Sequence, residues 1–141
     1  MDSIKIYFAG SIRGGRADVS RYFDIIELLR EYGRVLTEHV ADARLTENGD
    51  LEDDYLIHNR DMLWLKEADC LIAEVTVPSL GVGYEIGTAT QWGKPVLCLF
   101  HSGDGTALSA MISGSDRLTV GEYQNRADIR SMLATFFATS F

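Results

Sequence analysis

Apolar runs of strand length alternate along this 141-residue chain with segments whose apolar residues recur at helix spacing. Two of the runs, Cys70–Val75 and Val96–Phe100, are almost continuously apolar. A strand that is apolar on both faces belongs in a parallel sheet with a layer of helices on each side. Strands that alternate with helices build such sheets through right-handed crossovers. The pattern therefore predicts an α/β fold with a parallel sheet between two layers of helices.

The positions of the expected elements follow from apolar periodicity and from turn signals. We expect strands at 4–9, 34–38, 70–75, 96–100 and 118–120, and helices at 19–29, 53–68, 84–92, 106–112 and 127–138. Gly33 is expected to end the first helix as its C′ residue. The polar stretch 40–52, with an Asn48-Gly49 turn signal, is expected to be a loop. Because no repeat or linker interrupts the pattern, we expect one domain over residues 1–141.

The charge balance, the lengths of the apolar runs and the two cysteines limit the kinds of protein that this chain can be. Thirteen basic against 21 acidic residues give a net charge of −8, so the basic footprint of a duplex nucleic-acid binder is missing. No apolar run approaches the roughly 20 residues of a membrane span, and the N-terminus lacks the pattern of a signal peptide. Cys70 and Cys98 lie in apolar runs and are interpreted as buried free thiols. We expect a cytoplasmic protein, with the nucleus as an alternative.

Ligands of parallel α/β sheets bind at the carboxyl ends of the strands. The segment after the first strand, Gly10–Arg16, contains three glycines, Ser11 and two arginines. Backbone N–H groups at a helix N-terminus and arginine side chains are suited to a phosphate. The segment matches neither G-x-G-x-x-G nor the P-loop. The alternative is a glycine-rich turn with solvated arginines.

The segment after the third strand, Pro78–Gly87, also has the composition of a binding loop. Ser79 can cap a helix or contact a phosphate oxygen, and Gly81 allows close backbone approach. Glu85 is expected in the first turn of the next helix, where a carboxylate can simply complement the helix dipole. Aimed at a glycine-lined crevice, however, the same carboxylate can act as a nucleophile on a sugar carbon.

Asp61 shares a helix face with Ile57, Trp64 and Leu65, and a carboxylate on an apolar stripe is unusual. Desolvation and a second carboxylate nearby would suit it to general acid catalysis. The alternatives are an exposed aspartate at the edge of the apolar stripe, or an ion pair with Arg60 or Lys66.

Three further candidate site residues could equally have an ordinary structural role. Tyr7 lies near the end of the first strand and could be a core tyrosine. His39 follows the second strand without any metal-ligand spacing, and Ser109 could be a plain helix residue.

Several ordered motifs together resemble the 2′-deoxynucleoside 5′-monophosphate N-glycosidases of the nucleoside 2-deoxyribosyltransferase superfamily. They are Tyr7–Arg16, Val35–Ala43, Ala73–Thr76 with Pro78–Glu85, Leu97–Phe100 and Leu108–Ile112. The resemblance covers the chain from Ile4 to about Phe137 and implies a Rossmann-like fold. The chain departs from the family pattern in the loop 44–54 and at Asp24, where a basic residue is expected.

The resemblance implies that the bond between base and sugar of a nucleoside 5′-monophosphate is cleaved. Glu85 matches the nucleophile, Asp61 the residue that assists as acid or base, and Tyr7 the tyrosine beside the nucleophile. The matching substrate-binding positions are Ala9, Gly10, Ser11, Ile12, Arg13, Gly14, Gly15, His39, Ile57, Ser79, Gly81, Ser109, Ala110 and Met111. Among them, the Ser109–Met111 segment would reach the site of the other subunit of a homodimer.

The implied reaction passes through a covalent glycosyl-Glu85 intermediate that water hydrolyses to free base and (deoxy)ribose 5-phosphate. No metal or organic cofactor, nucleic-acid polymer or membrane partner is expected. Three other functions stay open on the sequence: a deoxyribosyltransferase between bases, a CMP-type ribonucleotide N-glycosidase, and a non-catalytic nucleotide-binding module.

Overall fold

The computed structural model of the protein describes residues 3–11, 16–37, 53–103 and 105–141. Its centre is an all-parallel five-stranded sheet in the order β2-β1-β3-β4-β5. The strands are β1 (Ile4–Ala9), β2 (Gly33–Val35), β3 (Cys70–Glu74), β4 (Val96–His101) and β5 (Thr119–Tyr123). The helices are α1 (Arg16–Leu29), α2 (Asp54–Glu67), α3 (Leu80–Gln91), α4 (Ala110–Ser113) and α5 (Arg126–Ser140). The predicted α/β, Rossmann-like sandwich is confirmed.

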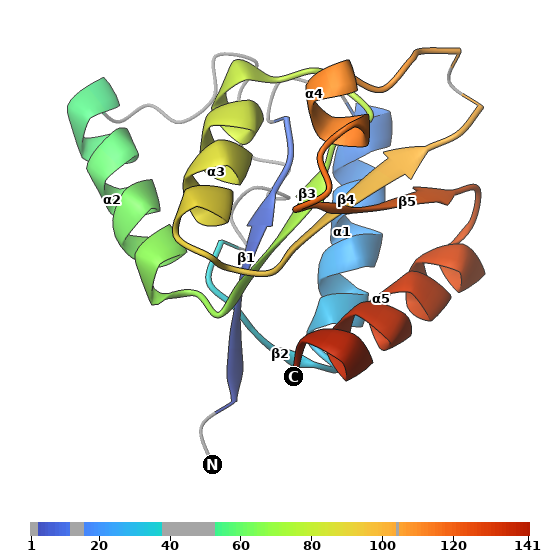
Figure 1. Ribbon diagram of the computed structural model, residues 1–141, viewed down its shortest axis with the longest axis horizontal. Helices are drawn as coiled ribbons and strands as arrows, with labels where there is room; N and C mark the ends of the chain where they lie inside the picture. Colours follow the sequence, from blue (N-terminus) through green and yellow to red (C-terminus); the bar gives the residue numbers. More distant parts are fainter. Residues whose placement is uncertain (1–2, 12–15, 38–52, 104) are drawn as a thin grey trace.

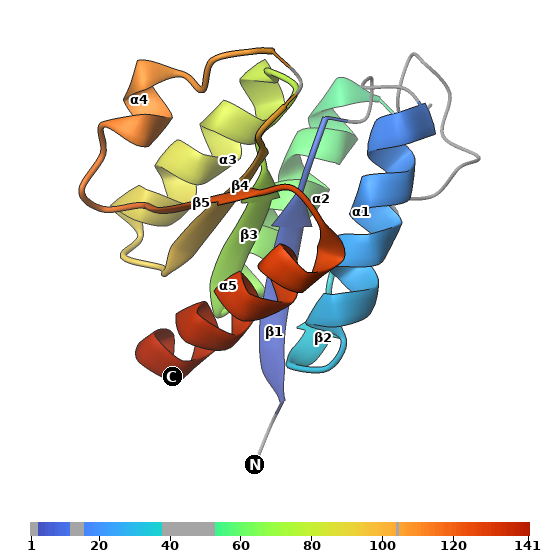
Figure 2. The ribbon, with the colours of Figure 1, turned by 90° about the vertical axis from the view of Figure 1, so that its right-hand side faces the viewer.

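The alternation of side chains along each strand supplies a separate core to each face of the sheet. On β1, Ile6 and Phe8 pack with α1 and α5, whereas Tyr7 and Ala9 face α2 and α3. Figures 1 and 2 show the same division, with α1 and α5 on one side of the sheet and α2 and α3 on the other. Burying one leucine or isoleucine fully contributes about 1.5–3 kcal/mol, so both cores stabilise the central strands.

Gly33 has a different role from the predicted one. Helix α1 ends at Leu29, and Gly33 is the first residue of β2, in register with Ile4 of β1. A Cβ at Gly33 would lie 2.1 Å from the Ile4 carbonyl oxygen. The position therefore needs glycine for a close backbone approach. It is Gly93, with φ 75°, that follows a helix end in the left-handed conformation, after α3.

The other predicted boundaries differ mainly at the ends of elements. Helix α3 begins four residues before the predicted Tyr84, because Ser79 caps it: the Ser79 side chain accepts a hydrogen bond from the Val82 N–H. Strand β5 extends to Tyr123 rather than to Val120. Within the described part of the chain, no helix combines the length and apolar character needed to cross a membrane. The predicted loop and Asn48-Gly49 turn lie outside the described residues.

Candidate active site

Tyr7 and Glu85 meet between the sheet and helix α3. Tyr7 is 2% exposed, and its hydroxyl donates a hydrogen bond to Glu85 Oε2. Glu85 is half-buried and lies on the sixth residue of α3, so the expectation that it occupies the first turn is wrong. The favourable dipole of a helix N-terminus is confined to the first turn. The structural alternative for Glu85 therefore loses its physical basis.

The electrostatics of this pair follow from burial and from a second carboxylate. Burial raises the pKa of Glu85 to about 7, with the Tyr7 hydrogen bond lowering it and the Asp61 charge raising it. Burial raises the pKa of Tyr7 far above its ordinary value, and the charges of Glu85 and Asp61 raise it further. Tyr7 is therefore a permanent hydrogen-bond donor, while Glu85 changes protonation near neutral pH.

Asp61 lies on α2, close enough to influence both Tyr7 and Glu85 electrostatically. Its Oδ1 is 3.1 Å from Arg60 Nε, and the side chain is 25% exposed. The Arg60 guanidinium in turn lies 5.0 Å from the centre of the Trp64 ring. The ion pair weighed as an alternative for Asp61 is thus present, and it leaves Asp61 beside the Tyr7–Glu85 pair. Ile57, one turn earlier, is partly buried.

The end of β1 leads directly from Tyr7 into the predicted phosphate loop. Ala9, Gly10 and Ser11 are all buried. A Cβ on Gly10 would lie 2.8 Å from the ring of Tyr22, so glycine here lets the turn pack against that ring. The other predicted residues of the loop, Ile12, Arg13, Gly14 and Gly15, lie outside the described residues, as does His39.

A cavity of about 390 Å³ lies on the other side of α3, toward α4. Ser79, Leu80 and Ile86 line it from the α3 side, and Ser109 and Met111 line it from the α4 side. Ser109 caps α4, its side chain accepting from the Met111 N–H at 3.2 Å. Figure 1 shows α3 between α2 and α4. The structure thus groups Ser79 with Ser109 and Met111, and groups Glu85 with Tyr7 and Asp61.

Two predicted positions beside that cavity are exposed to solvent. Ala110 is the first residue of α4, and Gly81 lies in the first turn of α3. A Cβ on Gly81 would have the Ser79 Oγ, 3.8 Å away, as its nearest neighbour, so no packing within the described chain requires glycine there. The open space suits the close approach of a ligand or a second chain. In the described ranges, no three His, Cys, Asp or Glu residues gather as a metal site would require.

Comparison with known proteins decides the family. A family model described as "Nucleoside 2-deoxyribosyltransferase" matches residues 6–119. The chain belongs to the nucleoside 2-deoxyribosyltransferase family. The resemblance of its motifs to this group is confirmed.

Two curated relatives in this family are about half identical to the chain. The "5-hydroxymethyl-dUMP N-hydrolase" of Mus musculus is 51% identical over 137 residues, 94% of this chain and 79% of the relative. The "Putative 2'-deoxynucleoside 5'-phosphate N-hydrolase 1" of Nematostella vectensis is 51% identical over 140 residues, 96% of this chain and 95% of the relative.

Solved structures share the fold of this chain at lower identity. A 2-deoxyribosyltransferase of Bacillus psychrosaccharolyticus has a TM-score of 0.69 at 20% identity, over 94% of this chain and 95% of that one. The CMP N-glycosidase BcmB of Clostridium botulinum has a TM-score of 0.68 at 20% identity, over 94% and 98%. Both support the family fold.

One polar cluster was not singled out by the sequence analysis. Thr76 and Tyr123 both donate hydrogen bonds to the Glu74 carboxylate near the ends of β3 and β5, and all three residues are buried. The signal available in the sequence for this cluster was Glu74, a carboxylate at the end of an otherwise apolar strand.

Proposed function

We propose that this protein hydrolyses the N-glycosidic bond of deoxynucleoside 5′-monophosphates, releasing the free base and deoxyribose 5-phosphate. The observation that carries the proposal is the Glu85 carboxylate, held by the Tyr7 hydroxyl and flanked by Asp61, in a chain half identical to named N-hydrolases. We take residues 1–141 as a single catalytic domain.

In the proposed reaction, the ionised Glu85 attacks C1′ of the sugar while the bond from C1′ to the base nitrogen breaks. The bonding electrons leave with the base, which takes up a proton. The resulting glycosyl ester of Glu85 is then cleaved by water, which delivers hydroxide to C1′, returns the carboxylate and releases a proton. The Tyr7 hydrogen bond favours the ionised form of Glu85 before attack. No metal or organic cofactor has a role in these steps.

Asp61 is proposed to handle the protons of both steps. Protonated, it can donate to the departing base or to a water beside it; ionised, it can accept the proton of the attacking water. The Nε of its neighbour Arg60 lies 3.1 Å from Asp61 Oδ1 and holds the carboxyl group in place. Repulsion between Asp61 and an ionised Glu85 is relieved when Glu85 becomes an ester, which lowers the barrier to its formation.

The substrate's phosphate is proposed to bind between the two strand-end segments. Ser11 and Ser79 supply hydroxyls, Gly10 and Gly81 backbone N–H groups, and the loop to Gly15 contributes Arg13. Ala9 and Ile12 would lie along the sugar, and His39 and Ile57 would border the base. Phosphate binding remote from C1′ holds the sugar in place for attack.

A homodimer with shared sites is part of the proposal. Figure 1 shows α4, which begins with Ala110, beyond α3 as seen from α2, and Ser109 and Met111 line a cavity whose lining does not include Glu85. Leu80 is 97% exposed and Met111 82% exposed, next to the apolar cavity. A second copy packed there would cover these side chains and carry its Ser109 segment to its partner's site.

We propose the cytoplasm as the compartment, since Cys70 and Cys98 are free thiols.

The deciding experiment is free-base release, followed by chromatography, from 5-hydroxymethyl-dUMP, dGMP, dCMP, GMP, CMP and unphosphorylated deoxyguanosine. Release from the deoxynucleoside monophosphates, lost in Glu85→Ala while nucleotide binding survives, is expected. Release only when an acceptor base is added would indicate a transferase instead. Release from GMP or CMP in preference would indicate a ribonucleotide N-glycosidase. Nucleotide binding without base release would reduce the protein to a binding module.

The shared site is tested by mixing two impaired variants. In a heterodimer of Glu85→Ala with Ser109→Ala, one site receives both intact residues and the other receives neither. If Ser109 acts on the partner's site, mixing restores about a quarter of wild-type activity at random assortment. Activity that stays at the average of the two separate variants would contradict sharing.

A further inference from the structure

A buried carboxylate, Glu74, ends β3 on the face of the sheet opposite Glu85. Alternation along β3 places it on the side of Cys70 and Ile72, which pack with α1 and α5. It is 1% exposed. Burying a charge among apolar side chains is costly, and a well-packed apolar residue in its place is often neutral or stabilising. Its presence therefore calls for an explanation beyond the core.

Three donors converge on this carboxylate. Oε1 accepts the Thr76 N–H at 2.7 Å, and Oε2 accepts the Thr76 hydroxyl at 2.9 Å and the Tyr123 hydroxyl. The Thr76 hydroxyl oxygen itself accepts the His101 N–H at 2.8 Å, which leaves its hydrogen for Glu74. An ionised carboxylate satisfies every one of these donors, and such charge-assisted bonds are stronger than neutral ones.

The cluster joins the carboxyl ends of three strands. Glu74 ends β3, His101 ends β4 and Tyr123 ends β5, and His101 and Tyr123 are in register with their rings 5.2 Å apart. Arg21 of α1 also acts on Glu74 electrostatically. The carboxylate therefore ties the end of β5 to the segment between β3 and α3.

That segment leads directly to the proposed site. Thr76 is held by Glu74, and only Val77 and Pro78 separate it from Ser79, which caps α3. The direction of α3 in turn sets the position of Glu85. A shift at Thr76 would thus displace the proposed phosphate contact first and the nucleophile less, because Tyr7 holds Glu85 independently.

We propose that Glu74 is a positioning residue, which acts through Thr76 to fix the β3–α3 segment and with it the phosphate contact of Ser79. The expected effect on catalysis rests on the proposed function. The effect of Glu74 on the β3–α3 segment can be measured without any activity. Glu74 contacts no substrate, so its loss should weaken nucleotide binding more than turnover.

The first readout is amide hydrogen exchange of the whole protein without nucleotide. Glu74→Gln and Thr76→Val should speed exchange over residues 76–83 by about tenfold relative to α2, whereas Thr76→Ser should restore protection. Thr37→Val is the matched control. Thr37 is equally buried and bridges the Phe8 N–H and carbonyl at 2.8 and 2.6 Å, so the same substitution there should leave 76–83 unchanged. Unchanged exchange over 76–83 in both test variants would overturn the proposal.

The second readout is the division between KM and kcat for the deoxynucleoside monophosphate that wild type cleaves fastest. Glu74→Gln and Thr76→Val should raise KM about tenfold with kcat within about threefold, and Thr76→Ser should stay within about twofold of wild type in both. Equal losses of kcat and stability without a KM change would overturn the positioning role. Should wild type release no base, the proposed function fails while the exchange experiment still tests the holding of the segment. If Glu74→Gln does not fold, the Thr76 pair carries both readouts.

Discussion

On each side of the sheet, a glutamate accepts a hydrogen bond from a tyrosine. The two glutamate–tyrosine pairs differ in their surroundings. Glu74 has Thr76 as a second partner and is almost fully buried. Glu85 has Tyr7, a half-buried position and a neighbouring carboxylate, Asp61. Within the described part of the chain, Thr76 and Tyr123 supply three donors to the Glu74 carboxylate, whereas Tyr7 supplies a single donor to Glu85. We therefore propose that the carboxylate with fewer donors and a like charge beside it, Glu85, is the reactive one of the two.

The sharpest way to break this comparison is to make the same substitution in both. Glu85→Gln should lower kcat at least about 10³-fold, because the amide cannot form the glycosyl ester. Glu74→Gln should leave kcat within about threefold. Steady-state base release with circular dichroism of both variants measures this. A similar fall in kcat for the two would mean that the contrast between them has no catalytic meaning.

Asp61 distinguishes the Glu85 pair from the Glu74 pair, and its loss should have the next largest effect. Asp61→Asn removes the acid and base while keeping the shape, so kcat should fall about 10²-fold. The fall in kcat should be smaller for a deoxynucleoside monophosphate whose base is a better leaving group, because that base needs less protonation. Measuring kcat of Asp61→Asn and wild type with this substrate and with an ordinary one checks the prediction. An equal loss for both would assign Asp61 to binding.

Burial raises the pKa of Glu85 and the Tyr7 hydrogen bond lowers it, so Tyr7 should influence the pH dependence of activity. If the ionised Glu85 is the nucleophile, as we propose, its pKa of about 7 means that kcat/KM should rise with pH through about 7. The Tyr7 hydrogen bond lowers this pKa, and Tyr7→Phe should therefore move the acid limb to higher pH. Tyr123→Phe removes the corresponding hydroxyl from the other pair and should leave the limb in place. A limb that moves in Tyr123→Phe, or stays in Tyr7→Phe, would break the assignment.

The sequence predicted the sheet and the residues that meet beside Glu85 more fully than it predicted their surroundings. Continuous apolar runs identified β3 and β4, and family motifs pointed to Tyr7, Asp61 and Glu85. The start of α3 was missed because Gly81 and Gly83 lower helix propensity, while the Ser79 cap compensates. The role of Gly33 depends on its approach to Ile4, a contact of 29 residues' separation that local patterns do not encode.

The Glu74 cluster escaped prediction for a related reason. Thr76 and Tyr123 are 47 residues apart in sequence and meet only because β3, β4 and β5 are adjacent. A single carboxylate at the end of an apolar strand gave no indication of which donors would reach it. Polar networks that join several strand ends are properties of topology, and local sequence windows detect their members one at a time.

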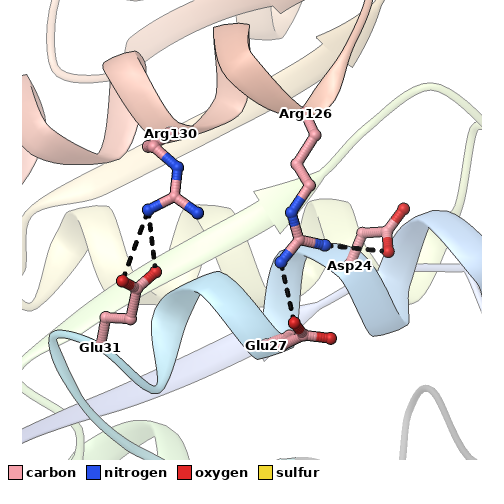
Figure 3. Close-up of polar contacts among 5 residues, drawn as sticks. All are labelled: Asp24, Glu27, Glu31, Arg126 and Arg130. Atoms are coloured by element: carbon pink, nitrogen blue, oxygen red, sulfur yellow. Dashed lines mark hydrogen bonds and ion pairs between the residues drawn. The ribbon is translucent and has the colours of Figure 1, made fainter.

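The smallest expected effect concerns ion pairs on the same face as Glu74, but at the surface. Arg126 of α5 lies 3.1 Å from Asp24 and 2.9 Å from Glu27 of α1, and Arg130 lies 3.3 Å from Glu31 (Figure 3). The structure thus places Asp24, where the family resemblance led us to expect a basic residue, in a contact between helices on the other side of the sheet from Glu85. The side chains of these pairs are 39–67% exposed, so solvent screens their attraction.

A double-mutant cycle on Arg126 and Glu27 should therefore give a coupling free energy below about 1 kcal/mol, and Arg126→Ala should lower Tm by only a few degrees. The coupling should shrink further in 1 M salt, where charges interact over about 3 Å. Arg130→Ala is the matched control and should behave alike, with base release unaffected in both. A coupling free energy above about 2 kcal/mol that persists in high salt would contradict this expectation. The exposed ion pairs between α1 and α5 would then stabilise the fold strongly, and burial would no longer distinguish Glu74 from the charged residues at the surface.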